Sequence, residues 1–144
     1  MNNALTTSRT LHYSAKTIFS KYSDPISLAR WWGPAGNTNT FHSFDFREGG
    51  KWIFTMHSDG HDYHNEWMFQ KIETNHILMK HDVAPIFTLE VLIEEINKNE
   101  TKMTWIARFE DINFFENAQE FLREKNEENF DRLEEEIKHY TSHE

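Results

Sequence analysis

The fold class depends on the stretch KMTWIARFEDINFFENAQEFLREKNEENFDRLEEEIKHY (residues 102–140), whose hydrophobic period changes part-way along. From Met103 to Phe109 every second residue is apolar, as in a strand with one buried face. From Asn113 to Tyr140 the apolar residues recur at spacings of three and four, which predicts a long amphipathic helix. Its expected buried stripe comprises Phe114, Ala118, Phe121, Leu122, Phe130, Leu133, Ile137 and Tyr140.

Upstream of this stretch, short runs of alternating hydrophobicity are separated by turn residues such as Gly49-Gly50, Ser58-Asp59-Gly60 and Ala84-Pro85. Two short helices, opening at Ser14 and at Ser23-Asp24-Pro25, follow the first strand. The expected strands are 6–13, 40–48, 51–57, 63–72, 77–82, 87–96 and 102–109. Consecutive strands form an antiparallel sheet, and the long helix must cover its apolar face, so the class is α+β.

Length and composition indicate one domain over residues 1–144 and exclude several classes of function. The net charge of −9 argues against nucleic acid and against an anionic membrane surface as partners. The chain has no cysteine, hence no disulfide or thiolate metal site. With no signal peptide and no apolar run long enough to span a bilayer, we expect a cytoplasmic protein.

The Gly49-Gly50 turn predicts a hairpin in which Arg47 faces Trp52 and Asp45 faces Phe54. Both glycines are expected at positive φ. Asp45, Arg47, Trp52, Phe54 and Met56 would then share one face. That face allows two interpretations. One is a surface ion pair with Arg47 stacked on Trp52, and the other is a polar anchor in a cavity wall.

The stripe of the long helix is interrupted by Asn126 and Asn129, which lie where apolar residues should connect Leu122 to Phe130. An amide on a buried face costs about 1–3 kcal/mol unless it is hydrogen-bonded. The helix therefore either extends past the edge of the sheet at this point or crosses a solvated cavity.

Motifs for metal binding and catalysis are absent from the sequence. His57, His61 and His64 flank one turn, but their spacing is not that of a metal site, and we predict neither a metal nor a cofactor. The chain contains no GxSxG, no P-loop and no GxGxxG. The acidic run EKNEENFDRLEEE is most simply a solvated helix face.

Three segments together resemble a known family: ARWWGPAG (residues 29–36), FDFREGGKWIFTMHSDGHDYHNEW (44–67) and NFDRLEEEI (129–137). Over about residues 10–140 the chain is similar to the START-like (SRPBCC, Bet v-like) superfamily, and within it to single-domain relatives of the heat-shock protein 90 ATPase activator. The resemblance implies a helix-grip fold, in which a curved antiparallel sheet surrounds a long C-terminal helix with a cavity between them. Relatives often have an aromatic residue where Asn126 stands.

The adjacent tryptophans Trp31 and Trp32 cannot both enter one face of a regular element. Trp32 continues the helical stripe of Leu28 and Ala29, so we expect it to pack inward. Trp31 would then point to the cavity mouth, with Gly33-Pro34-Ala35-Gly36 as its rim. The alternative is that both rings are wedged between helix and sheet.

The predicted function is binding of a hydrophobic or amphipathic small molecule, by a monomer or a homodimer. The alternatives are a module that interacts with a chaperone, as the family name implies, and a cyclase- or hydrolase-like enzyme, since the superfamily includes some. No catalytic residues are predicted. The expected ligand-binding residues are Trp31, Trp32, Arg47, Trp52, Phe54, Met56, Tyr63, Trp67, Trp105, Asn126 and Asn129.

Overall fold

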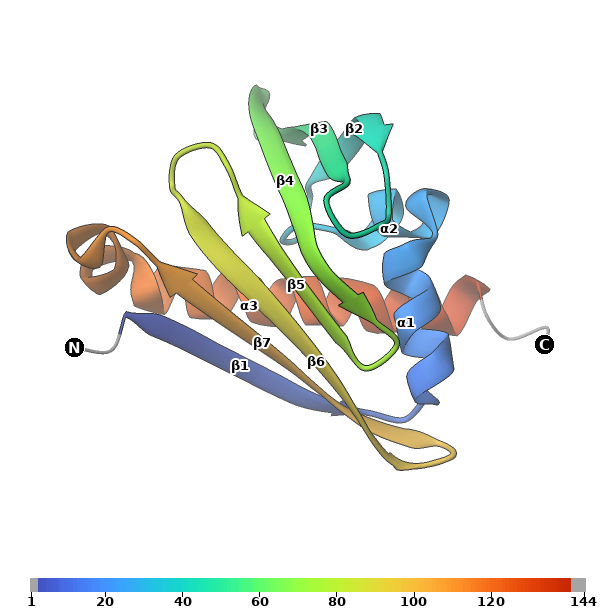
Figure 1. The fold of residues 1–144 in the computed structure, drawn as a ribbon. Helices are drawn as coiled ribbons and strands as arrows, with labels where there is room; N and C mark the ends of the chain where they lie inside the picture. The colour runs from blue at the N-terminus through green and yellow to red at the C-terminus, as the bar shows by residue number, and fades with distance from the viewer. Residues whose placement is uncertain (1–2, 141–144) are drawn as a thin grey trace.

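The computed structural model describes residues 3–140, which form a seven-stranded antiparallel sheet and three helices (Figure 1). The strands are β1 (Ala4–Leu11), β2 (Thr38–Phe44), β3 (Lys51–Ser58), β4 (His61–Glu73), β5 (His76–His81), β6 (Phe87–Asn97) and β7 (Glu100–Phe109). The helices are α1 (Ala15–Ser23), α2 (Pro25–Trp31) and α3 (Ile112–Tyr140). The predicted α+β helix-grip architecture is confirmed.

The strand order is β1-β7-β6-β5-β4-β3-β2, so β1 and β2 are the two edges of the sheet. Strands β2 to β7 are consecutive neighbours, as the tight turns predicted. The chain passes from one edge to the other through α1 and α2, and α3 then runs across the strands (Figure 1). Ser14 caps α1 by accepting a hydrogen bond from Thr17 N, and Asp24 caps α2 through Ile26 N.

The predicted register of the β2–β3 hairpin is wrong. Strand β2 ends at Phe44, which pairs with Trp52, and the chain then leaves the sheet before β3 begins. This register places aromatic rings rather than charges beside Trp52. The ring centroids of Phe44 and Phe46 also lie 5.9 and 5.1 Å, respectively, from that of Phe69 on β4. Burying Asp45 and Arg47 there instead would require desolvating two charges.

The loop between β2 and β3 needs its two glycines for different reasons. Gly49 has φ +84°, a left-handed conformation that glycine adopts readily, as predicted. Gly50 lies outside that region, contrary to the prediction. A Cβ atom on Gly50 would lie 2.1 Å from the carbonyl oxygen of Asp45, so the close approach of the backbone excludes any side chain.

The buried stripe of α3 lacks two of the predicted residues. Phe130, Leu133 and Ile137 are buried as expected, and Leu122 is half-buried. Phe121 is 60% exposed, because it lies about 100° around the helix from Leu122. Tyr140, at the end of the expected stripe, is exposed as well. The inward face at this level belongs to Leu122 and to the two asparagines.

Candidate functional site

A cavity of about 240 Å³ lies between α3 and the sheet. It has mainly apolar and aromatic walls, and its polar lining residues come from both the helix and the sheet. No aspartate or glutamate is among the residues that line it. The aromatic lining residues are Trp32, Trp67, Phe87, Trp105 and Phe109, and the polar ones, besides the imidazole of His81, are Asn65, Lys125, Asn126 and Asn129.

The two adjacent tryptophans have the opposite roles from those predicted. Trp31 is the last residue of α2 and is fully buried, with its indole N–H donating to the carbonyl of Lys21 at 3.0 Å. Trp32 follows the helix in an extended conformation (φ −68°, ψ 132°), which turns its ring to the cavity wall. The helical stripe therefore ends one residue earlier than expected. Both rings are buried, which agrees with the alternative that they are wedged between helix and sheet.

Trp32 also connects the other tryptophans of the chain. Its ring centroid lies 5.1 Å from that of Trp52, 5.3 Å from Trp105, 5.6 Å from Trp31 and 6.0 Å from Trp67. All five tryptophans thus form one cluster, and three of them border the cavity. Any ligand in the cavity would contact this cluster.

Asn129 explains part of the polar gap in the helix stripe. Its Oδ1 accepts a hydrogen bond from Gly33 N at 3.1 Å, and its Nδ2 donates to the carbonyl of Trp31 at 2.8 Å. The buried amide therefore satisfies the backbone of the Trp-Trp-Gly-Pro corner. Gly33 is at φ +100°, and a Cβ there would lie 3.0 Å from Nδ2 of Asn37. Helix and corner are thus fitted to each other at this point.

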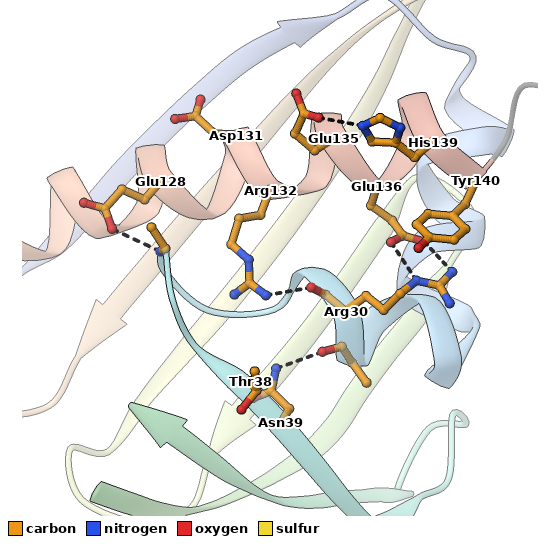
Figure 2. A pocket seen from close by; sticks show the side chains of 12 residues that line it. Arg30, Thr38, Asn39, Glu128, Asp131, Arg132, Glu135, Glu136, His139 and Tyr140 are labelled. Carbon is orange, nitrogen blue, oxygen red and sulfur yellow. Dashed lines mark hydrogen bonds and ion pairs between the residues drawn. The ribbon is translucent and has the colours of Figure 1, made fainter. Parts of the chain in front are cut away.

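Arg132, on α3, binds the backbone of the same corner, and Figure 2 shows its hydrogen bond to the carbonyl of Arg30. Its guanidinium donates to four backbone carbonyls, at distances of 2.6 to 3.1 Å. The acceptors are the carbonyls of Arg30, Trp32, Gly33 and Pro34. Burial lowers the pKa of Arg132. The end of α2 leaves its last carbonyls without helical partners, and Arg132 supplies a donor to that of Arg30. Its other three acceptors belong to the residues that follow the helix.

The residues drawn in Figure 2 line a second, more open groove of about 660 Å³ on the outer side of that corner. Its charged side chains already have partners within the protein. Glu136 accepts from Arg30 at 2.7 and 2.9 Å and from Ser27 at 2.8 Å. Burial alone would raise the pKa of Glu136, but these hydrogen bonds outweigh it and lower the pKa. We therefore take the less open cavity between α3 and the sheet, not this groove, as the candidate site.

Asn126 lies half-buried in the cavity wall and donates to Thr7 Oγ1 at 3.2 Å, which links α3 to β1. Of the two interpretations of the asparagine pair, the structure supports the cavity, since both amides line it. Both are also hydrogen-bonded to the protein. They can therefore remain in the buried stripe at low cost.

His81, at the end of β5, was not predicted as a site residue. Its ring is buried in the cavity wall, with Nδ1 2.8 Å from the carbonyl of Pro85 and Nε2 2.9 Å from the side-chain oxygen of Asn65. Burial lowers the pKa of His81, and the hydrogen bond to Pro85 opposes this only in part. Asn65 in turn donates from Nδ2 to the carbonyl of Tyr63 at 3.2 Å, which orients its oxygen toward the ring.

The sequence around His81 contains a pattern that predicts an inward-facing ring. It continues the alternation of Ile77 and Met79, both of which are buried, so period two places its ring on the inward face. Asn65 has the same relation to Trp67 and Phe69 along β4. A histidine and an amide at expected core positions indicate a polar site in the sheet.

The predicted site residues separate into two groups. Those that line the cavity are Trp32, Met56, Trp67, Trp105, Asn126 and Asn129. Those that do not are Trp31, Arg47, Trp52, Phe54 and Tyr63. Trp31, Trp52 and Phe54 are buried in the core, and Tyr63 is half exposed. Arg47 is in the exposed loop, paired with Asp45 at 2.9 Å, so the surface-pair interpretation holds although its ring contact with Trp52 does not occur.

A chain of polar side chains on β2, β3 and β4 resembles a catalytic relay but lies elsewhere. Thr40 Oγ1 is 2.8 Å from His57 Nε2, and His57 Nδ1 is 2.7 Å from Asp62 Oδ1. None of the three lines the cavity, and the Asp62 carboxylate is 71% exposed. Among residues 3–140, no group of three or more histidine and acidic side chains could hold a metal ion, and no helix is long and apolar enough to cross a bilayer.

Comparison with known proteins identifies the family of this chain. Residues 12–138 match the family described as "Activator of Hsp90 ATPase homolog 1-like protein". The chain belongs to this family. Its members share the START-like fold predicted from the sequence. No curated protein matches the chain significantly.

Solved structures from several bacteria are similar to this family member. A protein from Arthrobacter aurescens has 24% sequence identity and a TM-score of 0.85, with 98% of this chain and 93% of that one covered. A protein from Nitrosomonas europaea has 17% identity and a TM-score of 0.88, with 97% of both chains covered. A protein of unknown function from Staphylococcus aureus has 15% identity and a TM-score of 0.72, with 96% of both chains covered. At these identities the likeness concerns the fold.

Proposed function

We propose that this protein binds a small, largely apolar molecule in the cavity between α3 and the sheet. The observation that carries the proposal is a partly open cavity with aromatic walls and only a few polar groups, the arrangement typical of small-molecule sites. Trp67 and Trp105 form part of the sheet wall, while Leu122 and Asn126 belong to the helix. Contacts with the sheet and the helix would surround a ligand on two sides.

The size of the cavity restricts the ligand. Its volume of about 240 Å³ is just below the range of roughly 300–1,000 Å³ that is usual for drug-sized ligands. A single aromatic ring with a short substituent fits this space better than a long acyl chain or a multi-ring compound. Fatty acids and flavonoids are therefore expected to bind more weakly than one-ring compounds.

The cavity-bordering tryptophans provide the test. One-ring aromatic acids, amides, esters and phenols are titrated into the protein, and intrinsic tryptophan fluorescence is recorded, with native mass spectrometry to confirm stoichiometry. We expect at least one compound to bind with a Kd below about 100 μM, roughly −5.5 kcal/mol. If no compound in the panel binds at that level, the proposal is wrong.

A matched pair of variants locates the binding. Ala107 lines the cavity, and Ala107→Leu places a larger side chain in it, so binding should weaken about tenfold or more. Ala118, half-buried on α3, does not line the cavity, and Ala118→Leu should leave the affinity unchanged. Thermal unfolding of both variants establishes that they are folded. Equal losses in the two variants would place the binding site elsewhere.

Interaction with a chaperone is the second candidate function, and the family description favours it. Such a module would present a contiguous apolar patch. Among residues 3–140, three exposed large apolar residues lie far apart along α3, and three more lie one each on α2, β4 and β6: Ile112, Phe121 and Tyr140, and Ile26, Tyr63 and Ile96. A pull-down with purified Hsp90 tests this candidate directly, and stoichiometric binding that Ala107→Leu leaves unchanged would favour it over ligand binding.

A cyclase- or hydrolase-like enzyme would need an acid and a base in the cavity. The titratable side chains in the lining are those of His81 and Lys125. Both ring nitrogens of His81 are already hydrogen-bonded within the protein, to the carbonyl of Pro85 and to Asn65, so neither is free to exchange a proton with a ligand. This composition favours binding over general acid–base chemistry.

A further inference from the structure

The charges around the cavity indicate which ligand it takes. The protein carries 24 acidic residues and a net charge of −9, yet no carboxylate among residues 3–140 lines the cavity. Lys125 supplies the permanent charge of the lining, and the other polar side chains, those of His81 and three asparagines, are hydrogen-bonding groups. A lining of this kind attracts an anion and disfavours a cation.

Lys125 lines the cavity and is also partly exposed, so its flexible side chain can reach a charged group of a ligand from the solvent side. Its side chain is 34% exposed, and its ammonium lies 5.2 Å from the centre of the Phe121 ring. The carboxylate nearest to it is that of Glu128, at 3.5 Å, at the long end of the hydrogen-bond range. The other Glu128 oxygen accepts from Ala35 N at 3.1 Å. An ammonium has three donors, so this contact leaves two of them for a ligand.

Asn126, the next residue of the helix, also lines the cavity. One of its amide hydrogens is directed to Thr7 Oγ1, and an amide nitrogen carries two. His81 and Asn65, on the opposite wall, are bonded to each other and to backbone carbonyls. Asn129, also on the helix, donates one of its two amide hydrogens to the carbonyl of Trp31. The helix side therefore holds most of the donors left for a ligand, on Lys125, Asn126 and Asn129.

We propose that the ligand is a small aromatic carboxylate, with its carboxylate bound by Lys125 and Asn126 and its ring among Trp32, Trp67 and Trp105. The inference rests on the proposed function, since it concerns the same cavity. A carboxylate with two oxygens matches two donors on one wall, and charge-assisted hydrogen bonds are about twice as strong as neutral ones. A neutral ligand of the same shape fills the same aromatic space without that attraction.

The test compares 3-phenylpropanoate with 3-phenylpropanamide, which have the same number of non-hydrogen atoms and differ in charge. Their affinities for the wild-type protein are measured by calorimetry at neutral pH and low salt, where surface charges are least screened. We expect the acid to bind about tenfold more tightly than the amide. In Lys125→Met the acid should lose this advantage, while the affinity of the amide stays the same.

Lys138→Met provides the matched control. Lys138 is exposed on the same helix, does not line the cavity, and its loss changes the net charge by the same amount. It should leave the preference for the acid intact.

An amide that binds as tightly as the acid, or an equal loss of acid binding in both lysine variants, would overturn the carboxylate assignment while ligand binding stands. If neither compound binds although others in the panel do, the assignment is also wrong. If nothing in the panel binds, the proposed function itself fails.

Discussion

The two ends of the interior of this protein are both rich in aromatic residues, but only one of them is hollow. Beneath α1 and α2 a void of about 10 Å³ remains, which is too small to hold a ligand. At the other end, between α3 and the sheet, the cavity measures about 240 Å³. Trp32 borders both spaces. The number of large side chains therefore does not decide which end is filled.

The difference lies in what fixes the lining residues. At the packed end, around Tyr22, Leu28, Trp52 and Phe69, apolar side chains contact one another and are free to adjust until the space is filled. At the cavity, Asn129 and His81 are held by directed hydrogen bonds to the backbone of the Trp-Trp-Gly-Pro corner and of Pro85. Moving them inward would break these bonds. Polar anchors thus keep the cavity from collapsing.

The largest effect that this comparison predicts is a difference in stability between alanine variants of two leucines of α3. Leu133 is fully buried and does not line the cavity, so Leu133→Ala should cost about 2–5 kcal/mol of unfolding free energy. Leu122 is half-buried beside the existing cavity, where it has fewer contacts to lose, and Leu122→Ala should cost about 1 kcal/mol or less. Urea unfolding of both variants checks the difference. Equal costs would show that the two ends are packed alike.

An intermediate effect is expected from the polar anchors themselves. Asn129→Ala leaves Gly33 N and the carbonyl of Trp31 without their partner in a buried region, which should cost about 1–3 kcal/mol. Asn126→Ala removes one longer hydrogen bond to Thr7 at a half-buried position and should cost less, about 0.5–1.5 kcal/mol. Unfolding followed by tryptophan emission compares the two. A larger cost for Asn126→Ala would show that the corner does not depend on Asn129.

Most of the fold could be predicted because it depends on hydrophobic period and turn residues, which are local properties of the sequence. The Asp59-Gly60 turn illustrates this, since both residues have positive φ and join β3 to β4 as the sequence indicated. The β2–β3 register was missed because it depends on tertiary packing. Phe44 and Phe46 find aromatic partners on β4 that a hairpin considered alone does not reveal.

The site was predictable in part for a related reason. Asn126 and Asn129 stood out as polar residues in an apolar stripe, and both line the cavity. Arg47 was predicted as a site residue because the expected register put its charge among aromatic residues, but that register was wrong. His81 was missed because one polar residue at the end of a short strand is a weak pattern. The roles of Trp31 and Trp32 depended on where α2 ends, and helix boundaries are poorly determined by sequence.

The smallest effect concerns the pH dependence of stability at His81. Burial lowers the pKa of this ring in the folded protein, so the unfolded chain, with a histidine pKa of about 6.5, binds the proton more readily. Stability therefore rises with pH where the unfolded state holds more protons. The contribution of His81 is complete above about pH 6.5 and decreases as the pH falls from there through the lower folded pKa. In His81→Gln this contribution is absent, so unfolding free energies measured from pH 7.5 to 5 should fall less steeply than in the wild type. The other histidines are common to both proteins, and the difference between the two curves isolates His81. A variant that loses stability as steeply as the wild type would mean that the ring gives up its proton no more readily in the cavity wall than in the unfolded chain.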